Sequence, residues 1–330
     1  MGTPDLSAIA LLGGAALLDY LIGDPWSLPH PVQFMGWVIS AYSRVAIAWL
    51  KVPWTLRLAG IGLTLLVILG SGAIAFGLVW LGNYLHPILG MILAILFLSA
   101  CIAGRSLRDA ALDVLTPLQQ GDLEESRSRL SRYVGRDTDQ LSEVEILRAV
   151  LETVTENAVD GVMAPLFYAI LGALIHPMAA VALAMGYKAA STLDSMVGYR
   201  RAPYTYLGWC SARLEDILTW LPCRLTVLTL AIWSRRPRQV LQVCRRDAIA
   251  DPSPNSGWSE CIYAAVLGVQ VGGDNIYRGV VTSKPLLGDP VRPITPTVIQ
   301  EAIALTRLCL FLWLGCGLVL VLLSKANSIR

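Results

Sequence analysis

The chain has 330 residues, of which 55% are hydrophobic and only 15% are charged, and its mean hydropathy is positive. This composition excludes an ordinary soluble domain and indicates a protein that crosses the membrane several times. The net charge of +2 gives no indication of a nucleic-acid partner. The excess of Arg over Lys suits fixed recognition of phosphate or carboxylate groups.

Long uncharged segments predict the membrane helices, because a helix needs about 20 apolar residues to cross a bilayer. We therefore expect an all-α, polytopic integral membrane protein that forms a single domain over residues 1–330. The first segment is expected to be retained, because it lacks the basic flank of a signal peptide. The segments cover residues 6–18, 58–81, 85–103, 162–187, 225–233 (the weakest) and 302–323.

Charged residues are concentrated in four polar stretches. The positive-inside tendency places these stretches on the cytoplasmic side. We therefore expect a multi-pass protein of the inner cell membrane whose active site, built from helices and loops, faces the cytoplasm. The stretches cover residues 105–160, 188–216, 234–260 and 272–301.

The apolar segment 162–187 must then leave the membrane on the side where it entered. It contains Gly172 and the pair His176-Pro177 near its middle, and proline disfavours helical geometry in the residue before it. We predict two short helices in a hairpin. One Pro-kinked span is the alternative, since membrane helices tolerate proline.

The stretch 105–160 is expected to be mostly helical, with a break at Pro117 and a second helix that begins at Gly121-Asp122. A third helix follows, for which the candidate N-caps are Asp137, Thr138 and Ser142. Within it, acidic residues recur every four positions, so that a helix places three carboxylates in one column just before the chain turns apolar. The column consists of Glu152, Glu156 and Asp160, preceded by Arg148.

Like charges at this spacing destabilise a helix by roughly 0.2 to 0.5 kcal/mol per pair unless something neutralises them. One interpretation is a solvated helix face on which Arg148 pairs with Glu152. The other is a cation site, because Glu156, Asn157 and Asp160 offer the oxygen ligands that Mg²⁺ takes, usually together with substrate phosphates. We favour the cation site, since the helix runs directly into the apolar segment VMAPLFY.

Three further polar clusters are candidate site residues. Thr192, Asp194 and Ser195 could simply cap a turn. Alternatively, Asp194 and Ser195 form a phosphate and metal surface together with Lys188, Arg200 and Arg201. Arg213, Glu215 and Asp216 lie on an otherwise apolar helix, where charge is a functional hypothesis by default. Asn255 or Ser256 caps a helix whose N-terminus could bind an anion. The sequence GGDNIYRG at 272–279 is expected to be a glycine-rich loop.

Several other chemistries are not supported by the sequence. GxxxxGK[ST] does not occur, which argues against a P-loop nucleotide site, and there is no nucleophile elbow. The three histidines lack zinc-ligand spacing, and the seven cysteines form no CxxC pair, as expected of small reduced core residues. Hard oxygen ligands with arginines remain, and these favour phosphate chemistry.

Taken in order, the motifs resemble those of the adenosylcobinamide-phosphate synthases, the CbiB/CobD family of cobalamin biosynthesis. The resemblance covers nearly the whole chain, and its most specific elements are RDT, ETVTEN, TLDSM and PSPN. This chain has Thr155, Lys188 and Glu215 where the family often has Ala, Arg and Asp. Lys in place of Arg would weaken a bidentate contact at that position.

The resemblance implies an integral membrane ligase that joins the propionate carboxylate of adenosylcobyric acid to the amine of (R)-1-amino-2-propanol O-phosphate. The reaction is ATP-dependent, so ATP and Mg²⁺ are the expected cofactors. The expected partners are the two substrates, the lipid bilayer and other membrane enzymes of late cobalamin biosynthesis.

A carboxylate must be activated before an amine attacks it, most simply as an acyl phosphate, and phosphoryl transfer needs Mg²⁺ and cationic groups. We hypothesise that Glu152, Glu156 and Asp160, with Asn157, hold the ion, and that Asp194 is a second ligand or the base. All are expected to converge at the cytosolic edge of the bilayer. Substrate and phosphate binding is assigned to Arg136, Asp137, Lys188, Ser195, Arg213, Asp216, Asn255 and Ser256.

Two other functions are compatible with the hydropathy pattern. A transporter of small anions would use the break at His176-Pro177 as a discontinuous helix. A non-catalytic membrane sensor would not need the acids at positions 152, 156 and 160, which are present here. We favour the enzyme for this reason.

Overall fold

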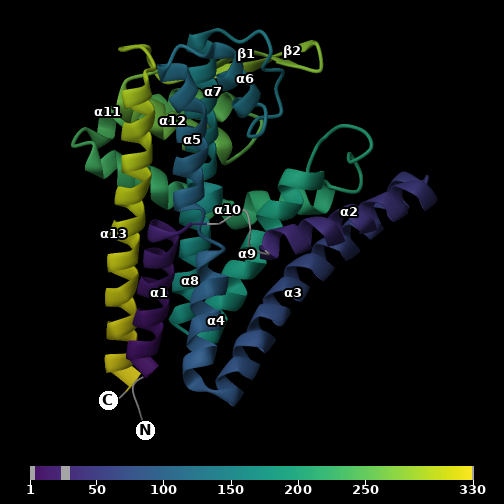
Figure 1. The fold of residues 1–330 in the computed structure, drawn as a ribbon, viewed down its shortest axis with the longest axis vertical. Coiled ribbons are helices and arrows are strands. Elements are labelled where there is room, and N and C mark those ends of the chain that lie inside the picture. Colours follow the sequence, from purple (N-terminus) through teal and green to yellow (C-terminus); the bar gives the residue numbers. More distant parts are fainter. Residues whose placement is uncertain (1–3, 24–29, 329–330) are drawn as a thin grey trace. The chain divides into compact units, whose positions relative to one another are not determined.

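The computed structural model describes residues 4–23 and 30–328, and it is mostly helical (Figure 1). Its internal contacts divide the chain into two compact units, each assembled from segments distant in sequence. The first unit consists of Met1–Ala103, Ala164–Thr219 and Phe311–Arg330, and the second of Gly104–Met163 and Trp220–Leu310. The predicted all-α class is confirmed, with one small β-ribbon added.

The first unit contains most of the apolar helices. Residues such as Leu11, Ile39 and Leu98 are fully buried where these helices meet, whereas Leu69 and Trp80 on α3 are exposed. A helix that is apolar on its buried and its exposed faces is typical of a membrane span. The helices are α1 (Pro4–Leu21), α2 (Pro31–Trp49), α3 (Pro53–Leu85), α4 (Pro87–Ser99), α8 (Ala164–Ala173) and α9 (Pro177–Val197), with parts of α10 (Trp209–Trp233) and α13 (Pro296–Ser328).

The described residues contain three helices that are long and apolar enough to cross a membrane, or four if the pair α4 and α5 (Gly104–Gln119) forms one broken span. The three are Pro53–Leu85, Trp209–Trp233 and Pro296–Ser324. They include the predicted apolar segments 58–81, 225–233 and 302–323. The prediction of a polytopic membrane protein is confirmed.

The predicted hairpin within residues 162–187 is confirmed as the pair α8 and α9, which the break at residues 174–176 separates. The two helices approach each other closely at Gly172, where an added Cβ would collide with the carbonyl oxygen of Ala179. Only a residue without a side chain permits this approach.

All three histidines of the chain serve the same structural purpose. His30, His86 and His176 each precede a proline at the first position of a helix, in the extended conformation that the proline imposes. The Nδ1 atom of each accepts a hydrogen bond from the backbone N–H two residues later, at 3.2 to 3.3 Å. These N-caps account for the histidines without a metal.

The second unit contains the polar helices. The predicted helix start at Gly121-Asp122 is confirmed, and Asp122 caps α6. Of the three candidate N-caps of the next helix, Ser142 is the one that caps α7, in a capping box with Glu145. Pro117 does not break α5, because it lies near the end of that helix. The elements are α5, α6 (Leu123–Leu130), α7 (Glu143–Ala158), a π-helical turn (Val159–Met163), α11 (Pro237–Asp247), a 3₁₀ turn (Ala248–Ala250), α12 (Ser256–Leu267), β1 (Val271–Tyr277) and β2 (Val280–Leu287).

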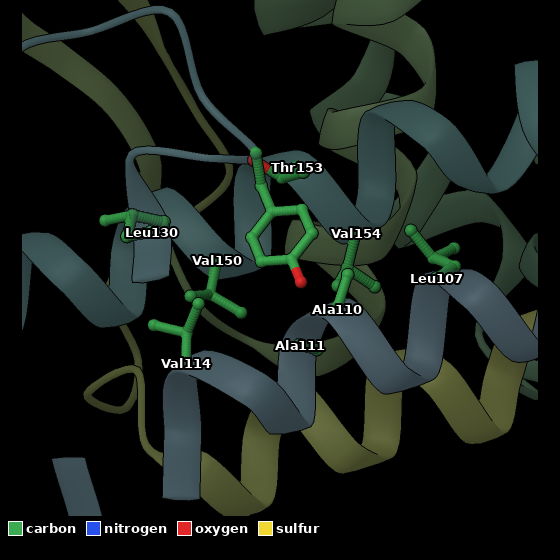
Figure 2. Close-up of a pocket in the computed structure, with 9 residues that line it drawn as sticks. Leu107, Ala110, Ala111, Val114, Leu130, Val150, Thr153 and Val154 are labelled. Atoms are coloured by element: carbon green, nitrogen blue, oxygen red, sulfur yellow. The ribbon is translucent and has the colours of Figure 1, made fainter. Parts of the chain in front are cut away.

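Helices α5, α6 and α7 pack around a small apolar cavity (Figure 2). Val114 of α5, Leu130 of α6 and Val150 of α7 line it. Its volume of about 20 Å³ is close to that of a single water molecule. It is therefore a packing gap in the core and not a substrate site.

The prediction of a loop at residues 272–279 is wrong, because this segment forms β1 and pairs antiparallel with β2. Arg278 and Gly279 form a two-residue turn with φ of 53° and 76°, as a tight hairpin turn requires. Gly272 and Gly273 obscured the strand in the sequence, since glycine weakens strands and here accompanies an irregularity in the pairing.

Exchange of Gly172 for Ala is expected to lower the midpoint of thermal unfolding in detergent, because the methyl group would force α8 away from α9. Gly77→Ala on α3 is the matched control, since nothing lies within 4 Å of a Cβ added there. That change should be neutral or stabilise by up to about 1 kcal/mol. Equal midpoints for the two variants would contradict the close approach.

Candidate active site

A buried ion pair fastens α7 to the β-ribbon within the second unit. Arg136, 8% exposed, donates to the carboxylate of Glu152, which is 1% exposed. Arg136 also donates to Asn275 Oδ1 at 2.7 Å, and Glu152 Oε1 accepts from the Gly272 backbone N–H at 2.9 Å. Each partner thus has hydrogen bonds beyond the pair itself, which a buried ion pair needs in order to offset desolvation.

The expected alternative, in which Arg148 pairs with Glu152 on a solvated face, is wrong. Arg148 reaches the ribbon instead, where it donates to the backbone carbonyls of Gly272 and Asp274, the latter at 2.8 Å, and to Asn275 Oδ1 at 3.2 Å. Because Glu152 is buried and Arg148 bonds to carbonyl groups, this helix face is an interface with β1.

A second acidic group of this unit was missed in the sequence. Glu260 on α12 is 1% exposed, and its Oε1 lies 3.5 Å from Nζ of Lys284 on β2. Within the described residues, neither carboxylate oxygen of Glu260 accepts a hydrogen bond. Glu156, which is half-buried and makes no hydrogen bond or ion pair with any described residue, is close enough to interact electrostatically with both.

The surroundings of this cluster shift the pKa values of Glu260 and Lys284. Burial, opposed by Lys284 and reinforced by Glu156 and Glu152, raises the pKa of Glu260 to about 8. Burial alone would lower the pKa of Lys284, but Glu260, Glu156 and Glu152 together raise it. The cluster therefore combines one lysine with three acidic side chains, of which Glu260 is largely protonated at neutral pH.

The carboxylate column does not continue as a regular helix. A π-helical turn over Val159–Met163 follows α7 and contains Asp160. Although Asp160 is four residues after Glu156 in the sequence, the wider turn takes it out of the α-helical alignment with Glu152 and Glu156. π-Helical turns are rare in proteins, and those that occur are often found at functional sites. Asn157 is exposed, and its amide donates to the Thr153 carbonyl at 2.9 Å.

Three other predicted residues of this unit participate in local structure. Asp137 accepts from the backbone N–H groups of Arg278 and Gly279 at 3.0 and 2.7 Å, and so holds the hairpin turn. Asn255 is at the N-cap position of α12 without a side-chain cap. The Ser256 hydroxyl donates to Asp251 at 3.3 Å. Their proposed contacts with substrate stay predictions.

The remaining predicted residues belong to the first unit. Lys188, Asp194 and Ser195 are on α9, and Arg213 and Asp216 are on the part of α10 that this unit contains. Asp194 lies close enough to Glu215 to interact electrostatically, and Asp216 to Arg213.

A buried hydrogen-bonded chain connects the two helices next to these residues. The Thr219 hydroxyl donates to Glu215, and Thr219 also shares a hydrogen bond of 2.7 Å with the Tyr187 hydroxyl. This chain fixes the position of Glu215, which is 7% exposed. Ser195 has a local role, since its hydroxyl donates to the Ser191 carbonyl at 2.9 Å.

Over residues 4–23 and 30–328, no three Asp, Glu, His or Cys side chains are grouped so that they could hold a metal ion. The predicted set of Glu152, Glu156 and Asp160 is therefore not assembled, and both oxygens of Glu152 are already engaged. Glu156 retains free acceptor oxygens. Since Mg²⁺ commonly takes one or two carboxylates and completes its shell with substrate phosphates and water, its binding here stays a prediction.

These features define a helical membrane protein with a buried cluster of acidic and basic groups. The chain matches the family model described as CobD/Cbib protein over residues 12–306. It is 53% identical over 324 residues to the cobalamin biosynthesis protein CobD of Synechocystis sp., with 98% of this chain and 94% of the relative covered. The CbiB protein of Salmonella typhimurium is 40% identical over 317 residues, with 95% of each chain covered.

A third relative, the cobalamin biosynthesis protein CobD of Halalkalibacterium halodurans, is 42% identical over 296 residues, with 88% of this chain and 89% of the relative covered. No solved structure matches the chain. The chain therefore belongs to the CobD/CbiB family. This membership supports an enzymatic role in cobalamin biosynthesis.

Exchange of Arg136 for Met is expected to destabilise the protein by about 3 to 5 kcal/mol, because it leaves the Glu152 carboxylate buried and unpaired. Arg132→Met is the matched control, since Arg132 is 60% exposed and lies 4.0 Å from Asp113. It should cost less than about 1 kcal/mol. Denaturant unfolding in detergent measures both, and similar losses would contradict a special role for the buried pair.

Exchange of Lys284 for Met is expected to destabilise the protein more at pH 8.5 than at pH 6. The native pKa of Glu260 lies above its unfolded value, so stability from this group falls as the pH rises toward 8. Loss of the lysine would raise this pKa further, so that the fall in stability would continue to a higher pH than in the parent protein. Thermal midpoints at the two pH values, compared with the parent protein, measure the effect; an equal loss at both would contradict it.

Proposed function

We propose that the protein is an adenosylcobinamide-phosphate synthase, which forms an amide between the propionate carboxylate of adenosylcobyric acid and the amine of (R)-1-amino-2-propanol O-phosphate. The observation that carries the proposal is the acidic cluster of the second unit, in which Glu156 and Glu260 accept no hydrogen bond from the described residues. Family membership over residues 12–306 supports this specific reaction.

The chemistry requires two things of the protein. The substrate carboxylate resists attack by an amine, so it must first be activated, most simply by transfer of a phosphoryl group from ATP to one of its oxygens. The amine nitrogen then forms the C–N bond, phosphate leaves, and the former ammonium group gives up its protons. Cationic groups must therefore stabilise phosphate charge, and a carboxylate must accept a proton.

The cluster has groups suited to both needs. We assign Glu156 as a Mg²⁺ ligand, because its carboxylate is half-buried and makes no hydrogen bond or ion pair with the described residues. The ion would supply charge neutralisation at the transferring phosphoryl group. Lys284 is the cation beside it. The ionised form of Glu260, which is the minor form at neutral pH because its pKa is about 8, accepts the proton of the ammonium group.

Other predicted residues take roles that fit their contacts. Arg136 and Glu152 bond to each other and to the ribbon, so we assign them as positioning residues. Lys188 and Arg213 of the first unit remain our candidates for phosphate binding, and Asp194 for a second metal ligand or base. Dependence on ATP follows from the resemblance alone.

Exchange of Glu156 for Gln is expected to lower the rate of amide formation by about 100-fold or more, which corresponds to about 2.7 kcal/mol of transition-state stabilisation. The purified protein is incubated with adenosylcobyric acid, aminopropanol phosphate and Mg-ATP, and the amide is measured by mass spectrometry. Glu143→Gln, at an exposed position of the same helix, should retain full activity. A fully active Glu156→Gln protein would remove this residue from the site.

The same assay separates the enzyme from the transporter. An enzyme converts the two substrates into a product of higher mass in detergent solution. A transporter would form no product there, and would move a small anion across the membrane of a sealed vesicle. Absence of the amide with all three substrates present, from correctly folded protein, would overturn the proposed function.

A further inference from the structure

A cluster of arginines follows α10 directly. Five of the twelve residues at 235–246 are Arg, and all five are exposed. Arg246 forms ion pairs with Asp247 and Asp289. The side chains of Arg235, Arg238 and Arg245 form no hydrogen bond or ion pair with the described residues. The proposed reaction uses none of them.

The segment is strongly amphipathic. Val240 and Cys244 on α11 are buried, whereas Arg238, Arg245 and Arg246 are exposed. Its apolar face packs inside the protein, as in an ordinary surface helix, and this leaves the arginines on the exposed face. It begins four residues after Trp233, the last residue of a candidate span, and the Trp233 side chain is 52% exposed. Exposed tryptophans are enriched at the membrane interface.

One of these arginines, Arg236, lines a cavity of about 500 Å³ within the second unit. Trp233, Ser234 and Arg236 form one side of it, and Ala304, Leu305 and Leu308 of α13 form an apolar wall. Arg236 donates to the Val266 carbonyl at 3.2 Å, and Glu301 at the rim is paired with Arg292. The cavity therefore combines an apolar wall with unneutralised positive charge.

The geometry points to one occupant: we propose that this cavity and the arginines at 235–238 bind a single anionic phospholipid, with its phosphate on the arginines and an acyl chain against α13. Two observations favour a lipid over a soluble phosphate. Two of the helices that border the cavity, α10 and α13, are candidate membrane spans. A soluble phosphate would also leave the apolar wall uncovered, whereas an acyl chain buries it.

The test measures lipid affinity by native mass spectrometry of the full-length protein in detergent. Phosphatidylglycerol is expected to bind as one tight equivalent, at least ten-fold tighter than phosphatidylcholine with the same acyl chains. The double variant Arg235→Gln/Arg238→Gln should lose about 25-fold in affinity for phosphatidylglycerol, about five-fold per arginine, and little for phosphatidylcholine. Arg236 is left unchanged, so that its contact with Val266 is kept.

Two further variants define the site. Arg132→Gln/Arg278→Gln removes two exposed arginines of the same unit and should change the affinity less than two-fold. Ala304→Phe places a larger side chain in the cavity, which Ala304 lines, and should lower the affinity for both lipids. Circular dichroism checks that each variant is folded; should Ala304→Phe fail this check, the arginine pair alone decides.

Three results would overturn the proposal. These are equal affinity for the two lipids, an equal loss in the control double variant, and displacement of phosphatidylglycerol by millimolar inorganic phosphate. The last result would assign the arginines to a soluble anion. If phosphatidylglycerol stays bound in the presence of excess inorganic phosphate, the result supports a phospholipid as the ligand.

Discussion

The second unit depends on one ion pair that is almost fully shielded from water. Arg136 and Glu152 come from a loop and a helix, and the backbone of Gly272 and the side chain of Asn275 complete their hydrogen bonds. A buried pair of this kind contributes little net stability compared with apolar packing, but it is very costly to break. It therefore acts by specifying which surfaces meet, and it aligns α7 with the ribbon.

The cluster of Glu156, Glu260 and Lys284 follows from that alignment. Glu156 is one helical turn after Glu152, and Lys284 is on the strand that pairs with β1. Once the pair fixes the ribbon on α7, these groups are brought within electrostatic reach of Glu260 on α12. A fold that only had to be stable would replace them with apolar residues. The carboxylate oxygens of Glu156 and Glu260, which accept no hydrogen bond from the described residues, are groups of the kind that a cation-binding site requires.

Local rules predicted a large part of this structure. The apolar segments 58–81, 225–233 and 302–323, the hairpin at His176-Pro177, the start of α6 and the N-cap Ser142 depend on neighbouring residues alone, and each is confirmed. The partner of Glu152 depends on which distant segment lies next to α7, so the sequence suggested Arg148, one turn away. Glu260 was missed for the same reason. Its role is visible only with Lys284 beside it, and the two residues are brought together by the ribbon that was predicted as a loop.

Gly272 of the ribbon cannot be exchanged as freely as a glycine in a loop. In an exposed loop, glycines tolerate exchange, and laboratory evolution often begins there. Gly272 has φ of 91°, and a methyl group at this position would collide with the carbonyl of Pro285, next to Lys284. A one-carbon change there would push the two strands apart and pull the amide away from Glu152. Libraries designed to alter the specificity of this protein should therefore leave position 272 unchanged and diversify the turn beyond it.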